Sequence, residues 1–166
     1  MTNPEGKKPR RRARTSRPAF LASKSSSESK AFAKLCDILS RRDHSLKELQ
    51  EKMSLRFEQE AIDKAIEMAD EYGYLKDPQE IAERVAEAQH LRCRGFRKIE
   101  FELKKKALPD VEMDPERELE KARELLDKLI RKHDDTSFET KQKCMRSLAS
   151  RGFLMDTIRQ VTDEKF

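Results

Sequence analysis

The stretch SLKELQEKMSLRFEQEAI, residues 45–62, sets the pattern for the fold. Its apolar residues recur at intervals of three and four, as on one face of a helix: Leu46, Leu49 and Met53. Ser45 precedes them, and Glu48 follows Ser45 at the spacing of a capping box. After a short break at Phe57, Ile62 opens a second apolar stripe. The stretch therefore predicts a capped helix, a tight turn and a second helix.

The same outline returns twice further along the chain. Residues 94–111 read RGFRKIEFELKKKALPDV, and residues 137–158 read SFETKQKCMRSLASRGFLMDTI. Aligning Leu49 with Ile99 and Cys144 gives spacings of 50 and 45 residues. A unit repeated at such intervals indicates a helical array in which each unit packs mainly on its neighbours.

Composition favours such an array over a globule with one deep core. Of the 166 residues, 42% are charged and only 36% are hydrophobic, and Trp is absent. This apolar material can fill thin cores between adjacent helices, and alternating strand patterns are missing. We therefore predict an all-α fold of about eight helices, arranged as an elongated curved array of three tandem three-helix repeats.

Residues 1–27 are expected to form a disordered basic tail, because they combine Pro, Ser and Arg with few apolar residues. Such a tail is either an arm that contacts phosphates or acidic protein, or a solvated segment. The three repeats are then expected over residues 28–75, 76–113 and 114–166. The third helix of the middle repeat should be reduced or missing, since a helix start signal already follows at Asp114.

Basic charge is unevenly spread along the chain. The net charge is +5, with +7 on residues 1–30 and −2 on residues 31–166. Within the body, residues 90–108 carry +5 and form a basic strip. Its members are Arg92, Arg94, Arg97, Lys98, Lys104, Lys105 and Lys106. The strip is interpreted as a contact surface for phosphate or acidic protein, with a solvated helix face as the alternative.

Three further arginines are weaker contact candidates, because they stand at the ends of equivalent elements: Arg41, Arg42 and Arg151. A second set is assigned to the core and not to any contact surface: Leu46, Leu49, Met53, Ile99, Leu103 and Leu148. Phe57 and Phe153 are expected to pin turns. The neighbouring acids Glu116 and Glu118 are interpreted as solvated surface.

No motif of catalysis or cofactor binding is present. The sequence lacks a Gly-rich phosphate loop, G-x-S-x-G and H-E-x-x-H. His90 and Cys93 could share a helix face, but no second ligand pair lies nearby to complete a metal site. The three cysteines form no CxxC pair, and no apolar run is long enough to span a membrane. We expect a cytoplasmic, monomeric protein without catalytic residues, cofactor or metal.

A DNA-reading helix-turn-helix is the alternative interpretation of residues 45–75. That fold would next require a β-hairpin wing, whereas Asp77 and Pro78 begin another helix. The second helix is also acidic, which suits a phosphate-lined groove poorly. A helix-turn-helix transcription factor therefore remains the second hypothesis.

Three stretches resemble the repeats of the RecX family, bacterial regulators of the RecA recombinase. LSRRDHSLKELQEKM with EQEAIDKAIEMADEYGYLKD, within residues 39–77, is similar to the first repeat of that family. RCRGFRKIEFELKKKAL resembles the middle repeat, and KCMRSLASRGFLMDTIRQV resembles the last. The chain departs from the family pattern at Arg56 and Phe57, which lack the Gly that usually stands between them.

The resemblance implies a regulator that inhibits RecA without catalysing a reaction. It implies binding in the groove of the RecA filament on single-stranded DNA, across neighbouring protomers. Such binding would block filament extension, strand exchange, ATP hydrolysis and co-protease activity. Direct contact with DNA would be weak and non-specific. The basic strip and the three further arginines are the residues expected to contact this partner.

Overall fold

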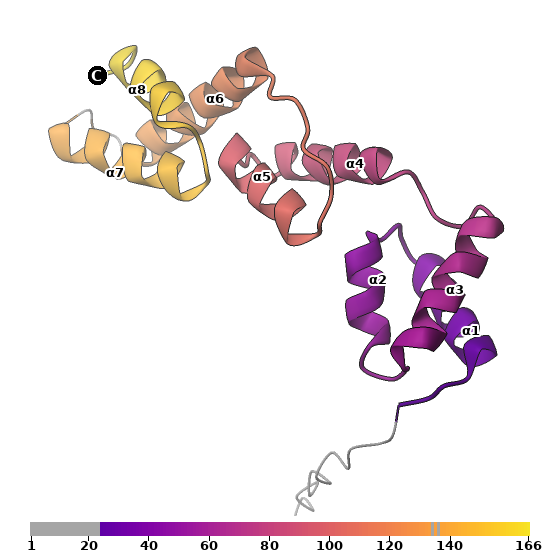
Figure 1. Cartoon of the computed structure of the whole chain (residues 1–166). Coiled ribbons are helices and arrows are strands. Elements are labelled where there is room, and N and C mark those ends of the chain that lie inside the picture. Colours follow the sequence, from indigo (N-terminus) through magenta and orange to yellow (C-terminus); the bar gives the residue numbers. More distant parts are fainter. Residues whose placement is uncertain (1–23, 134, 136) are drawn as a thin grey trace, which may run out of the picture.

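The computed structural model describes residues 24–133, 135 and 137–166. Over these residues the chain forms eight α-helices and, apart from one isolated bridge, no β-structure (Figure 1). The helices are α1 (Glu28–Leu39), α2 (Leu46–Met53), α3 (Gln59–Glu71), α4 (Pro78–His90), α5 (Phe96–Lys105), α6 (Pro115–His133), α7 (Phe138–Ser150) and α8 (Met155–Asp163). The predicted all-α helical repeat is confirmed.

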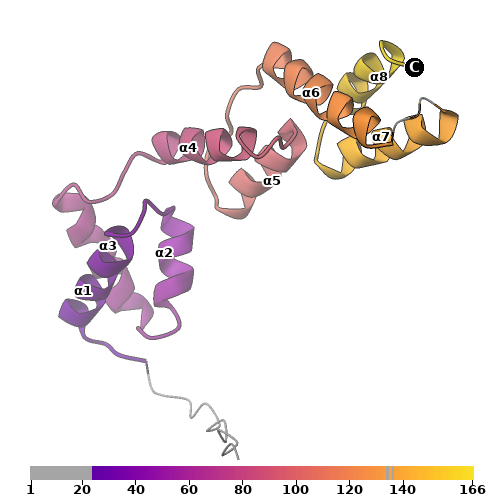
Figure 2. The ribbon, with the colours of Figure 1, turned by 180° about the vertical axis from the view of Figure 1, so that it is seen from behind.

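The helices follow one another in three groups along an elongated, bent body (Figures 1 and 2). The first group is α1–α3, the second is α4 and α5, and the third is α6–α8. Each group has its own cluster of buried apolar side chains. The thin cores expected from the composition are therefore present. The repeat boundaries given above remain predictions.

The first group is built as its sequence pattern indicates, with one exception. Ser45 and Glu48 form the complete capping box of α2, and Leu49 and Met53 are fully buried. Leu46 was also expected in the core, but 47% of it is exposed. It is the first residue of α2 and lines the wall of a groove between α2 and α3. The expectation for Leu46 was therefore wrong.

The second group contains two helices and no third. Asp77 caps α4 by accepting a hydrogen bond from the backbone N–H of Gln79 at 2.7 Å, with Pro78 as the first helical residue. After α5 ends, Ala107 takes a left-handed conformation with φ of 52°. The chain then runs without a helix to Pro115. That this group is a three-helix repeat with its third helix reduced or missing remains a prediction.

The prediction of a disordered tail over residues 1–27 falls mostly on residues 1–23, which lie outside the described residues. Ser25 pairs with the turn between α2 and α3. Its N–H donates to the carbonyl of Arg56 at 2.8 Å, and its carbonyl accepts from the N–H of Glu58 at 3.0 Å. Contacts of the first group therefore begin a few residues before the expected start of the first repeat.

Candidate interaction surface

The basic strip lies on α5 and on the turn that precedes it. The inner side of α5 carries Ile99 and Leu103, which are fully buried. On the outer side of α5, Arg97, Lys104 and Lys105 are exposed and Lys98 is half-buried. Exposed Arg92 and half-buried Arg94 lie before the helix, and half-buried Lys106 follows it. The α5 helix thus presents basic side chains outwards because its apolar residues face the core of the second group.

Phe101 is a member of this outer surface that the sequence analysis missed. It stands 60% exposed on α5, between the positions of Arg97 and Lys104. Its place in the apolar pattern could have revealed it, since it falls out of phase with Ile99 and Leu103. The outer surface of α5 is therefore both basic and aromatic.

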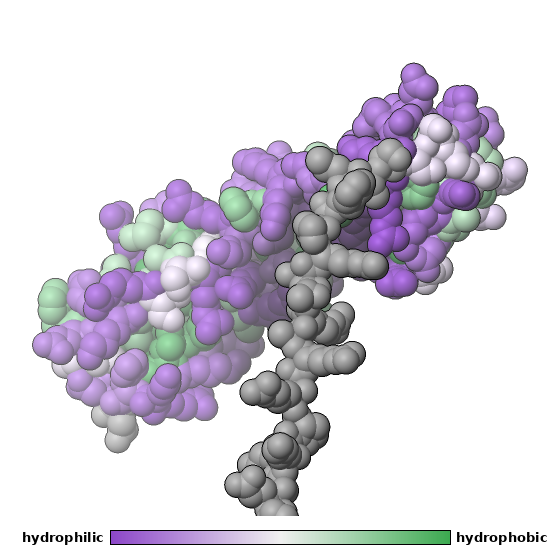
Figure 3. Space-filling view, turned by 90° about the horizontal axis from the view of Figure 1, so that it is seen from below, coloured by the Kyte–Doolittle hydropathy of each residue, from purple (hydrophilic) through white to green (hydrophobic). Residues whose placement is uncertain are grey.

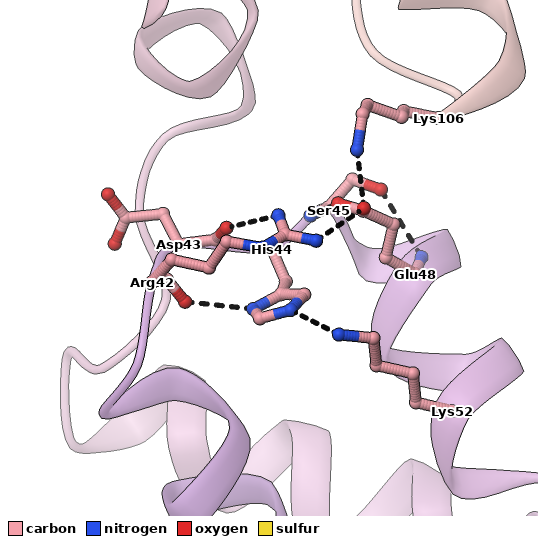
Figure 4. A network of polar contacts seen from close by, with 7 residues as sticks. All are labelled: Arg42, Asp43, His44, Ser45, Glu48, Lys52 and Lys106. Carbon is pink, nitrogen blue, oxygen red and sulfur yellow. Dashed lines mark hydrogen bonds and ion pairs between the residues drawn. The ribbon is translucent and has the colours of Figure 1, made fainter. Parts of the chain in front are cut away.

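Two of the candidate contact residues, Arg42 and Lys106, instead pair with one acid inside the protein. Glu48 accepts a hydrogen bond from Arg42 Nη2 at 2.9 Å and forms an ion pair with Lys106 (Figure 4). Glu48 and Arg42 belong to the first group of helices, whereas Lys106 directly follows α5. This cluster therefore links the first group to the second, and a role of Lys106 and Arg42 in partner binding would compete with that link.

His44 belongs to the same cluster and lies below Glu48 in Figure 4. It is only 4% exposed. Its Nδ1 lies 2.8 Å from the carbonyl oxygen of Arg42, and its Nε2 lies 2.6 Å from Lys52 Nζ. Burial is the main cause that lowers the pKa of His44. A neutral ring, which donates from Nδ1 and accepts the lysine proton at Nε2, satisfies both contacts.

Glu48 should make the protein sensitive to acid. Burial alone would raise its pKa, but hydrogen bonds from Arg42, Lys106 and the Ser45 N–H lower the pKa from 4.5 to about 2. Because the folded pKa is depressed, the stabilisation is present above pH 4.5 and is lost as the pH falls towards 2. We expect Glu48→Gln to lower the free energy of unfolding at neutral pH and to flatten its decrease between these values. Urea unfolding across this range measures both effects, and identical pH profiles for the two proteins would contradict the expectation.

The second and third groups meet backbone to backbone. The N–H of Gly95 donates to the carbonyl of Arg151 at 2.9 Å, and the N–H of Arg97 donates to the carbonyl of Gly152 at 3.0 Å. A Cβ atom on Gly95 would lie 2.2 Å from the backbone nitrogen of Phe153. No side chain fits between these segments, so glycine is required at Gly95 for steric reasons. Arg151 is thereby placed beside the start of the basic strip.

A buried ion pair completes this junction. Glu118 and Lys121 of α6 are 2% and 9% exposed and lie 2.9 Å apart. Glu118 also accepts from the N–H of Phe96 at 2.9 Å, at the first turn of α5. Lys121 donates to the carbonyl of Arg94 at 2.9 Å and to His90 Nδ1 at 2.8 Å. The interpretation of Glu118 as solvated surface was therefore wrong, because its carboxylate caps a helix of the neighbouring group.

Phe57 and Phe153 are 7% and 1% exposed and belong to the cores of the first and third groups. Their role in pinning turns stays a prediction. Arg41 is exposed and pairs with Asp37 at 3.4 Å. Arg42 lies at one end of the strip, where it shares Glu48 with Lys106. Arg151 lies at the other end, where its carbonyl accepts from the N–H of Gly95. For Arg41 the structure shows only the local ion pair with Asp37.

A groove of about 410 Å³ lies between α2 and α3 on the described surface. Leu46, Ile66 and Leu75 supply apolar walls, and acidic side chains border them: Asp63, Glu67 and Asp70. The exposed side of α3 is thus acidic, as its sequence indicates, and α4 follows where a winged helix would need its β-hairpin. On the face shown in Figure 3, hydrophilic residues dominate, and they separate the hydrophobic residues from one another into groups.

Two features are absent from residues 24–133, 135 and 137–166. No group of three or more His, Cys, Asp or Glu side chains there could hold a metal ion. No helix in this part of the chain is long and apolar enough to cross a membrane.

Comparison with known proteins finds relatives that are described as RecX. The profile described as the first three-helix domain of RecX matches residues 31–67, and that of the third matches residues 116–162. A protein named Regulatory protein RecX from Clostridium botulinum is 31% identical over 129 residues, which are 71% of this chain and 60% of the relative. One of the same name from Prosthecochloris aestuarii is 28% identical over 140 residues, 81% of this chain and 93% of the relative.

The chain therefore spans about 60% of the length of the Clostridium relative. Among solved structures, RecX from Lactobacillus salivarius superposes with a TM-score of 0.72 at 22% identity. It covers 82% of this chain and 95% of the solved chain. This likeness supports the fold.

Proposed function

The chain belongs to the RecX family, and on that premise we propose that it regulates the RecA recombinase. It binds the RecA filament on single-stranded DNA, lies along the filament groove and hinders extension. Strand exchange, ATP hydrolysis and co-protease activity decrease as a consequence. Family membership supports the regulatory role, and the form of the molecule supports the mode of binding.

The observation that carries the proposal is the elongated body with α5 near its middle (Figure 1), together with the basic side chains on the outer side of that helix. An extended array can contact successive protomers of a filament, and each further contact raises affinity by avidity. The junction between the second and third groups is made of direct backbone hydrogen bonds, so these groups present a fixed surface. A fixed surface loses less conformational entropy on binding than a flexible one.

The outer side of α5 and the groove between α2 and α3 differ in charge and suit different partners. The outer side of α5 is basic and suits the phosphates of the DNA strand. The groove between α2 and α3 is apolar with an acidic border, which suits a protein surface carrying Lys or Arg. In this proposal Arg92, Arg94, Arg97, Lys98, Lys104 and Lys105 face the filament. Arg41, Arg42, Lys106 and Arg151 contribute at the margins.

The protein acts by occupying a surface and not by catalysis, as a monomer in the cytoplasm. The direct test is the growth of RecA filaments on single-stranded DNA, followed in real time with fluorescently labelled RecA. Addition of the protein should slow extension at concentrations below that of RecA. Unchanged growth with a cognate RecA would contradict the proposal.

The triple variant Arg97→Ala, Lys104→Ala, Lys105→Ala should weaken this inhibition several-fold, because it removes exposed charge from the outer side of α5. Lys106 is left in place because its replacement would also break the ion pair with Glu48. If the charges contact a single strand, the salt dependence of filament binding should also fall, by about 0.7 in log–log slope per lost phosphate contact.

A matched control removes the same charge from the third group. Arg131→Ala, Lys128→Ala, Lys143→Ala also replaces one arginine and two lysines, all exposed. Two of these have only loose ion pairs of 3.8 and 3.9 Å, comparable with the 4.0 Å pair of Lys104. Equal loss of inhibition in both triple variants would show that net charge, and not the basic strip, is responsible.

A further inference from the structure

Phe101 occupies an unusual position on α5. Its ring is 60% exposed on a helix whose other side supplies the core residues Ile99 and Leu103. It takes part in no aromatic pair among the described residues. An isolated exposed apolar residue is common and needs no explanation by itself. Phe101 differs from such a residue in the side chains that surround it.

The four residues that adjoin Phe101 at helical spacing are basic, whereas its sequence neighbours Glu100 and Glu102 are acidic. Residues three and four positions away are the ones that adjoin a residue on a helix. For Phe101 these four are Arg97, Lys98, Lys104 and Lys105. One of them, Lys104, has a 4.0 Å ion pair with Glu100, and no ion pair within the described chain involves the other three.

A second exposed phenylalanine provides the contrast. Phe138 of α7 is 75% exposed, more than Phe101. It is the first residue of its helix, and of the two positions that follow it at helical spacing only Lys141 is basic; Lys141 pairs with Asp163 at 2.9 Å. Both rings are therefore exposed, but only Phe101 has four basic neighbours, three of which have no ion pair among the described residues.

We propose that the outer side of α5 is a binding site for a single-stranded nucleic acid, with Phe101 as the platform on which a base stacks. An aromatic face accepts any base, and basic groups beside it neutralise the phosphates on either side. With a helical rise of about 1.5 Å per residue, Arg97 and Lys105 lie roughly 12 Å apart along the axis, on opposite sides of the ring. A single strand that crosses α5 therefore meets positive charge, an aromatic face and positive charge again.

This inference deepens the proposed function, because it assigns the DNA strand of the filament as the partner of this face. It can nevertheless be tested without RecA. Binding of the full-length protein to a fluorescein-labelled oligothymidylate is measured by fluorescence anisotropy over a range of salt concentrations. A failure of RecA regulation and a failure of base stacking would then be seen in separate experiments.

Phe101→Ala should weaken oligothymidylate binding about 5- to 150-fold, the range expected for the loss of one stacked base. The salt slope should stay unchanged, since no phosphate contact is lost. Phe101→Trp should bind at least as well as the original protein. Phe101→Leu retains apolar area without an aromatic face and should bind nearly as poorly as Phe101→Ala. Lys104→Ala should instead reduce the salt slope.

Phe138→Ala is the matched control and should bind like the original protein. Because both rings are exposed, circular dichroism should show the same helicity for every variant. The inference is overturned if the original protein does not bind the oligonucleotide at low salt, or if Phe101→Ala or Phe101→Leu binds as well as it does. It is also overturned if Phe101→Ala loses RecA inhibition with unchanged oligonucleotide binding, since the ring would then contact protein.

Discussion

Replacing Gly95 with Ala should lower the free energy of unfolding by about 2–4 kcal/mol and loosen the junction between α5 and the third group of helices. The added Cβ would lie 2.2 Å from the Phe153 nitrogen and 2.4 Å from the Gly152 carbonyl oxygen. Both are backbone atoms, which cannot move aside as a flexible side chain would. The segments must separate, and the hydrogen bonds from Gly95 and Arg97 to the facing carbonyls are then lost or lengthened.

Gly73→Ala is the matched control, because Gly73 needs glycine for its backbone conformation and not for lack of space. Its φ is +68°, a conformation that favours glycine, but nothing lies within 4 Å of a Cβ placed there. Its replacement should cost only about 1 kcal/mol of backbone strain. Urea unfolding measures both values, and amide exchange at Gly95 and Arg97 should rise in the Gly95 variant alone. Equal destabilisation by the two substitutions would contradict the steric account.

Replacing Glu118 with Ala should destabilise the protein by about 3 kcal/mol, since removal of one partner leaves a buried charge unpaired. Lys121 would keep its contacts to His90 and to the carbonyl of Arg94 but lose the only carboxylate that pairs with it in the described chain. The N–H of Phe96 would also lose its acceptor at the start of α5. Burial and the charge of Lys121 lower the pKa of His90, so this ring stays neutral beside the lysine.

The control for this variant is Glu116→Ala, on the same helix but exposed, which should change stability by less than about 0.5 kcal/mol. The double variant Glu118→Leu, Lys121→Met removes both charges together. It should be less destabilised than Glu118→Ala, because neither charge remains buried alone. Urea unfolding compares the three proteins, and a double variant weaker than the single one would contradict the role assigned to the pair.

Local patterns made most of the fold predictable. The capping box of Ser45 and Glu48 and the Asp77–Pro78 start signal act within a few residues, and both helices begin where these signals indicate. Periodicity also located the buried Leu49, Ile99 and Leu148. It misplaced Leu46, because spacing alone does not show that the first turn of α2 borders an open groove.

The candidate site was less predictable from the sequence than the fold, because its contacts join residues that are far apart along the chain. Lys106 and Glu48 are 58 positions apart, so a count of charges cannot show that they pair. Glu118 was interpreted as surface because one of its partners, the N–H of Phe96, lies 22 positions away and meets it only where the start of α5 contacts α6. Only the structure shows that the backbones at Gly95 and Gly152, which are 57 positions apart, meet at this junction. The contact role of the basic strip remains a prediction.

The rate of ATP hydrolysis by RecA on single-stranded DNA tests the central claim most directly. The protein should lower this rate when present at a small fraction of the RecA concentration, because one elongated molecule that blocks extension affects many protomers. The variant with Arg97, Lys104 and Lys105 replaced by Ala should require several-fold more protein for the same effect. A rate that stays unchanged with a cognate RecA, even at equal concentrations of the two proteins, would contradict the account.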